Sequence, residues 1–245
     1  MPISPLFTSV LEETFEINFL QCYPNGLLKP TDLCNILQLT AAKHAELGGI
    51  SFTDMQAHHQ AWVLSRSRIE IERMPRWRET ITVKTWIQSL ENSRSIRCLE
   101  VFLGNEKIAG CETFWAVFNT QTRRPETLGL PHEHFKKFPT KATATAFKKI
   151  DISLATEFVG SKKVMLSDLD IVNHANSVKY MEWCLDTLAP EQLLKQKIAE
   201  IEVNYLKEVA FHDTVSIHEH KEDKSSIFNI TKDEKVCFSM EIGWK

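Results

Sequence analysis

The sequence has neither a strong charge excess nor a long apolar run. Its 245 residues carry a formal net charge of −3, and because neither half is strongly basic, a dedicated nucleic-acid-binding protein is disfavoured. No stretch approaches the roughly 18 consecutive apolar residues of a membrane-spanning helix. The first residues lack both a charged leader with an apolar core and an Arg- and Ser-rich transit segment. We therefore expect a cytoplasmic protein with no membrane span and no nucleic-acid partner.

Residue patterns typical of metal sites are also missing. The six cysteines are scattered, with no Cys-x-x-Cys pair. An even count leaves disulfides open, but the chain length and the apolar neighbours favour reduced, buried thiols. The pairs His58-His59 and His218-x-His220 have no third ligand at metal spacing. We expect no metal ion and no cofactor.

The same order of elements is predicted twice along the chain. A helix begins at Lys29-Pro30-Thr31-Asp32 and ends at Gly48-Gly49, with Pro and Asp where a first turn tolerates them. In the second half, helices are expected over 176–188 and 191–197. Alternating and β-branched runs predict strands in each half. These strands span 12–23, 62–72, 79–86, 94–103 and 107–118, then 151–165, 198–208, 213–220, 226–232 and 236–243.

The two halves also match residue by residue. Glu79-Thr-Ile-Thr-Val matches Asp213-Thr-Val-Ser-Ile, and Ile69-Glu-Ile matches Val203-Asn-Tyr at the same offset of 134. This indicates a tandem duplication. Each main helix is apolar on more than one face, which describes an antiparallel sheet curled around a helix, an α+β unit. Because 121–150 is rich in proline and lysine, we predict domains over 1–128 and 147–245 joined by a linker over 129–146.

One short segment concentrates polar, titratable groups directly before the second main helix. It holds Asp168, Asp170, Asn173, His174 and Asn176. Such groups ahead of a helix N-terminus bring acid–base chemistry close to backbone N–H donors. By composition alone, however, Asp-x-Asp before a helix is more often a turn with an N-cap, and either asparagine suits the cap.

Several tracts together resemble the acyl-ACP thioesterase family, of the bacterial type without a transit peptide. They are Trp62-Val-Leu, the tract from Pro75 to Trp86, the tract from Trp115 to Pro125, the segment from Asp168 to Trp183, and Asn204-Tyr205…Lys207-Glu208. The resemblance implies a tandem double hotdog, with a catalytic second domain and a first domain that shapes the acyl pocket. It further implies hydrolysis of the thioester between a fatty acyl chain and acyl carrier protein, by a monomer or a homodimer.

The resemblance also assigns the catalytic residues. It maps the family's aspartate and histidine to Asp170 and His174, and its carboxylate to Glu208. We expect Glu208 as general base with Asp170 and His174 as polar partners, while direct attack by Asp170 stays open. Backbone N–H groups at the start of the 176–188 helix are expected to stabilise the oxyanion.

Two positions depart from the family pattern. The motif's asparagine falls on Val172, next to Asn173, so either Asn173 takes its place or the role is lost; Asn176 is the more structural candidate. The family's cysteine falls on Val209, which excludes a cysteine nucleophile there. These departures keep a non-catalytic acyl-binding or regulatory module open as an alternative. An acyl-CoA thioesterase is the enzymatic alternative.

Overall fold

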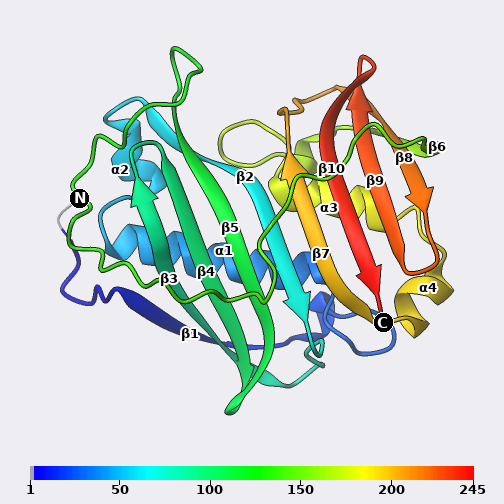
Figure 1. Ribbon diagram of the computed structural model, residues 1–245, viewed down its shortest axis with the longest axis horizontal. Helices are drawn as coiled ribbons and strands as arrows, with labels where there is room; N and C mark the ends of the chain where they lie inside the picture. Colours follow the sequence, from blue (N-terminus) through cyan, green and yellow to red (C-terminus); the bar gives the residue numbers. More distant parts are fainter. Residues whose placement is uncertain (1–2) are drawn as a thin grey trace. The chain divides into compact units, whose positions relative to one another are not determined.

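The computed structural model describes residues 3–245, which form two compact units (Figure 1). The first consists of residues 3–65 and 72–146. The second consists of Arg66–Ile71 and Phe147–Lys245. Strand β2, Gln60–Ile71, therefore contributes residues to both units.

The first unit combines one long helix with an antiparallel sheet of strand order β1-β3-β4-β5. Helix α1 begins at Pro30, whose fixed φ suits a first turn, and the backbone N–H of Gly48 donates to the carbonyl of His44 at its end. The predicted helix over this range is confirmed. The elements are β1 (Val10–Glu16), η1 (Phe19–Gln21), α1 (Pro30–Leu47), α2 (Phe52–Gln56), β3 (Thr80–Glu91), β4 (Arg94–Leu103) and β5 (Glu106–Asn119).

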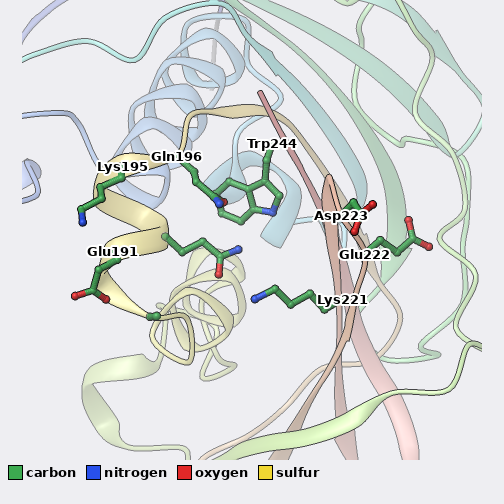
Figure 2. Close-up of a pocket in the computed structure, with 9 residues that line it drawn as sticks. Glu191, Lys195, Gln196, Lys221, Glu222, Asp223 and Trp244 are labelled. Atoms are coloured by element: carbon green, nitrogen blue, oxygen red, sulfur yellow. The ribbon is translucent and has the colours of Figure 1, made fainter.

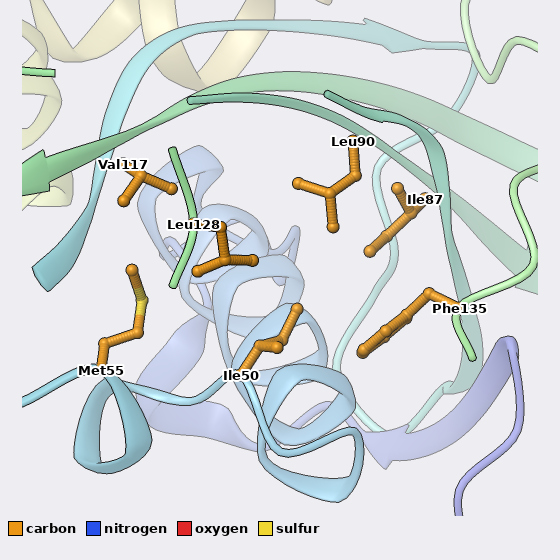
Figure 3. Packing of buried hydrophobic residues seen from close by; sticks show 7 residues of the cluster. All are labelled: Ile50, Met55, Ile87, Leu90, Val117, Leu128 and Phe135. Atoms are coloured by element: carbon orange, nitrogen blue, oxygen red, sulfur yellow. The ribbon is translucent and has the colours of Figure 1, made fainter. Parts of the chain in front are cut away.

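The core of the first unit includes side chains from the segment after β5. Figure 3 shows Leu128 and Phe135 beside Ile50, Ile87 and other buried apolar residues. A Cβ atom at Gly48 would come within 2.0 Å of the Phe135 ring, so no larger residue fits there without rearrangement. Residues 129–146, which were expected to form a linker, belong to this compact unit. The separate roles of the two predicted domains stay a prediction.

The second unit has an antiparallel sheet of strand order β7-β10-β9-β8-β6, and residues 66–70 of β2 pair with β7. Helix α3 is buried on nearly every side, as its apolar sequence predicts. The elements are β6 (Glu157–Lys163), η2 (Leu166–Asp168), α3 (Ser177–Leu185), α4 (Pro190–Lys195), β7 (Ile198–Tyr205), β8 (Thr214–Lys221), β9 (Ser225–Lys232) and β10 (Lys235–Trp244).

Several predicted elements differ from the structure. The strand expected over 12–23 is only Val10–Glu16, and the 3-10 helix η1 occupies Phe19–Gln21. The strand expected over 151–165 is only Glu157–Lys163, because Asp151 accepts hydrogen bonds from the backbone and hydroxyl of Ser153 and forms a turn. The helix expected to reach residue 188 ends at Leu185. The short helix α2 was not predicted, although Ser51 and Asp54 form the capping box that starts it.

Equivalent turns in the two units carry the same backbone contacts. Gly26 and Asn173 both have positive φ, 76° and 64°. The N–H of Leu28 donates to Pro75 O at 2.8 Å, and that of Ala175 donates to Val209 O at 2.9 Å. The tandem α+β fold predicted from the repeat is therefore confirmed, down to matching backbone hydrogen bonds in the two turns.

Two further expectations concern the cysteine thiols and a membrane-spanning helix. All six cysteines are free thiols, and five are buried, while Cys22 is half-buried. Among residues 3–245, no helix is both long and apolar enough to cross a membrane.

Candidate active site

The polar segment before α3 is a tight loop held by its own side chains. Asp168 is buried and accepts a hydrogen bond from the N–H of Met165 at 2.8 Å. Asn176 is the N-cap of α3, because its Oδ1 accepts from the N–H of Val178 at 2.9 Å. Asp168 and Asn176 therefore stabilise this loop. For Asn176, this is the N-cap role that the sequence predicts.

Asp170 organises the tip of the loop. Its Oδ1 accepts from the N–H of Val172 at 3.0 Å and from the N–H of His174 at 3.2 Å. Val172 takes part through its backbone alone, so the loop forms without a polar side chain at that position. Asn173 adopts the left-handed conformation, φ 64°, which asparagine tolerates better than most residues, and its side chain is exposed.

The fold brings His174 and Glu208 together from segments distant in the sequence. Nε2 of His174 lies 3.4 Å from Oε2 of Glu208, and each side chain is about one third exposed, at 32% and 36%. The backbone of the loop pairs with the segment after β7, at Ala210 and Val209. An imidazole and a carboxylate held together and open to solvent can activate a water molecule and return its proton.

A buried tyrosine fixes the segment that carries Glu208. The N–H of Val209 donates to Oη of Tyr180 on α3 at 2.9 Å. Burial raises the pKa of the Tyr180 phenol, the hydrogen bond from Val209 lowers it, and the nearby carboxylates of Glu208 and Asp170 raise it further. Tyr180 lies within the sequence motif, but its role is visible only in the fold, where its hydroxyl reaches the residue beside Glu208.

The start of α3 differs from the expected oxyanion-binding site. Two of its first N–H groups, those of Val178 and Lys179, donate to the side chain and the carbonyl of Asn176. A capped N-terminus leaves fewer donors for a ligand. The expectation that these groups stabilise an oxyanion is therefore wrong for Val178 and Lys179 in this conformation.

The matching positions of the first unit lack this chemistry. The bridge between Leu27 and Arg76 corresponds to the bridge between His174 and Ala210. By the same correspondence, Leu27 occupies the position of His174, and Met74 that of Glu208. The acid–base pair thus belongs to the second unit.

A surface pocket of ≈ 360 Å³ lies elsewhere in the second unit (Figure 2). It opens beside α4 and the turn after β8, whereas the His174–Glu208 pair lies near the segment that leads into β8. Its lining consists of other residues: Ala189, Glu191, Gln192, Lys195, Gln196, Lys221, Glu222, Asp223 and Trp244. This pocket is separate from the acid–base pair.

Comparison with known proteins relates both units to one family. The model of the acyl-ACP thioesterase N-terminal domain matches residues 8–134, and that of the C-terminal domain matches residues 153–245. This chain belongs to the acyl-ACP thioesterase family. The resemblance stated from the sequence motifs is therefore confirmed.

Curated relatives within the acyl-ACP thioesterase family are moderately similar. An oleoyl-acyl carrier protein thioesterase of Coriandrum sativum is 27% identical over 219 residues, which cover 80% of this chain and 59% of the relative. A dodecanoyl-[acyl-carrier-protein] hydrolase of Cinnamomum camphora is 26% identical over 216 residues, covering 81% and 56%. The chain thus spans less than two thirds of the length of these relatives.

Solved structures of acyl-ACP thioesterases share the fold over nearly the whole chain. A crystal structure from Bacteroides thetaiotaomicron superposes with a TM-score of 0.88 at 24% identity, covering 97% of this chain and 98% of that one. The 12:0-ACP thioesterase of Umbellularia californica gives a TM-score of 0.84 at 21% identity, covering 98% of each. The predicted double-hotdog fold is confirmed.

Proposed function

We propose that this protein hydrolyses the thioester between a fatty acyl chain and acyl carrier protein, releasing a free fatty acid and ending chain elongation. The observation that carries the proposal is the His174–Glu208 pair, 3.4 Å apart and open to solvent, in a chain of the acyl-ACP thioesterase family. The names of the curated relatives, which act on acyl carrier protein substrates, support the same substrate class.

In the proposed reaction, Glu208 is the general base. Its carboxylate takes a proton from a water molecule, whose oxygen attacks the thioester carbonyl carbon. The C–S bond of the resulting tetrahedral intermediate then breaks, and the proton returns through His174 to the leaving sulfur. Asp170 supports His174 by holding its backbone N–H. This engagement of Asp170 Oδ1 with two N–H groups disfavours Asp170 as the attacking nucleophile.

The two units have different proposed roles. The second unit carries the chemistry, and the first shapes the acyl pocket, because apolar Leu27 and Met74 stand where the second unit has His174 and Glu208. Acyl carrier protein is the proposed partner, the chain works as a monomer or a homodimer, and the cytoplasm is the proposed location. Asn173 and Asn176 act through the shape of the loop.

A thiol-release assay tests the proposal. The purified protein is given the same acyl chain on acyl carrier protein and on coenzyme A, across graded chain lengths. We expect release from acyl carrier protein at a higher kcat/KM. Faster release from coenzyme A would indicate an acyl-CoA thioesterase, and saturable acyl binding without thiol release would indicate a non-catalytic module. Either result overturns the proposal.

A further inference from the structure

The first unit contains a buried cation that the proposed reaction does not use. Arg97 on β4 is only 6% exposed and points toward α1. Its Nη1 lies 2.7 Å from Nδ1 of His44 and donates to Oγ1 of Thr85 at 3.2 Å. Both hydrogen bonds involve this one nitrogen, so the N–H groups of Nε and Nη2 are available to a further acceptor.

Neither neighbour neutralises the charge. The other ring nitrogen of His44, Nε2, lies 2.9 Å from the carbonyl oxygen of Thr8, so it must carry a hydrogen and donate. Nδ1 is then the acceptor for Arg97, and the imidazole is neutral. Burial, together with the charge of Arg97, lowers the pKa of His44 to about 3. Burial also lowers the pKa of Arg97 to about 10, which leaves the guanidinium charged at neutral pH.

A second buried arginine has its charge compensated within the chain. Arg68, 4% exposed, forms ion pairs with Glu70, Glu200 and Glu202. Within residues 3–245, Arg97 has no comparable carboxylate. Because a buried ion without a counter-ion costs several kcal/mol, an anion bound at Arg97 would stabilise this part of the first unit.

The surroundings of Arg97 suit an amphiphilic anion. Across the sheet, Arg97 lies beside Ile87 on β3, which belongs to the apolar core, and beside Thr113 on β5. The ring of His44 stacks on Phe7, with centroids 5.6 Å apart. A planar guanidinium binds a carboxylate through two parallel N–H donors. A fatty acid offers that head group together with a tail for the apolar wall.

We propose that Arg97 anchors the carboxylate of a free fatty acid inside the first unit. The choice of a fatty acid, rather than another apolar carboxylate, rests on the proposed function, because hydrolysis of an acyl thioester releases this molecule. The site is separate from the His174–Glu208 pair, which belongs to the second unit.

Calorimetric titration of the full chain with dodecanoate, below its micelle concentration, tests the site. Dodecanol is the matched probe, with the same tail and no charge. Arg97→Met removes the cation at similar length, and Arg94→Met is the control, since Arg94 is an exposed arginine of the same strand. Because hydrogen bonds to a charged group contribute about 1.5–3 kcal/mol, we expect Arg97→Met to weaken dodecanoate binding at least about 10-fold. Arg94→Met should change it less than about 2-fold.

Two outcomes overturn the proposal: dodecanoate affinity unchanged in Arg97→Met, or wild-type protein binding dodecanol as tightly as dodecanoate. Replacing a buried charge by an apolar residue is often neutral for stability, and Arg97→Gln replaces Arg97→Met if the latter does not fold. The titration uses no thioester. A protein that binds dodecanoate through Arg97 but releases no thiol would therefore refute the proposed function and leave this site standing.

Discussion

The sharpest test of the candidate active site is Glu208→Gln, which keeps the size of the side chain and removes its charge. The His174–Glu208 pair is about one third exposed at each partner, and such pairs contribute only about 0.2–1 kcal/mol to stability. For a chain of this length, that amounts to a fall in Tm of at most about 4 °C. Loss of a general base, by contrast, lowers the rate by about 10²–10⁴-fold, and even 10²-fold corresponds to about 2.7 kcal/mol in the barrier.

The assay therefore measures thiol release from acyl carrier protein and Tm on the same preparations. Glu182→Gln is the matched control, because Glu182 forms a similarly exposed ion pair with Lys179, at 2.9 Å. We expect Glu208→Gln to lose at least about 10²-fold in kcat with a small change in Tm, and Glu182→Gln to retain its rate. A Glu208→Gln enzyme within a few-fold of the wild-type rate would refute Glu208 as the base, even if the activity itself stands.

Four further predictions concern other residues. Asp170→Ala should lower kcat more than Asp170→Asn, because asparagine keeps an oxygen for the loop's two N–H groups; steady-state kinetics of both variants checks this. Asn176→Ala should destabilise the fold by about 0.5–2 kcal/mol through loss of the N-cap, measured by urea unfolding. The wild type should lose stability as pH falls from 6.5 toward about 3, since the unfolded state binds the His44 proton first, and His44→Gln should flatten this dependence of the urea midpoint. A thiol reagent should modify Cys22 first in the native protein, because the other five cysteines are buried.

Much of the fold follows from patterns in the sequence. The helix over 30–47 is marked by Pro30 at its start and Gly48 after its end, and those signals act locally. The repeat was visible because the segment around Glu79 and that around Asp213 meet the same packing requirements. The short helix α2 could not be predicted, because five residues show too little apolar periodicity to indicate a helix.

The site was predictable only in part. Asp170 and His174 lie four residues apart, so their association is local and a motif can show it. Glu208 comes from a distant segment, and only the resemblance pointed to it. The contact between Tyr180 and the backbone of Val209 depends on how α3 packs against the segment after β7, which no local pattern encodes. For the same reason, no local pattern predicts that Arg97 is buried without a carboxylate beside it.

Strand β2 has a consequence for any attempt to separate the two halves of the chain. Residues 66–70 pair with β7, and Arg68 among them neutralises Glu200 and Glu202. A fragment that begins at residue 147 would therefore expose the edge of β7 and leave these carboxylates without their cation. Although the gene contains two repeats, a cut between them would not release two self-sufficient proteins. The second unit includes Arg66–Ile71 from the first half of the chain, so the boundary between the repeats in the sequence is not the boundary between the units.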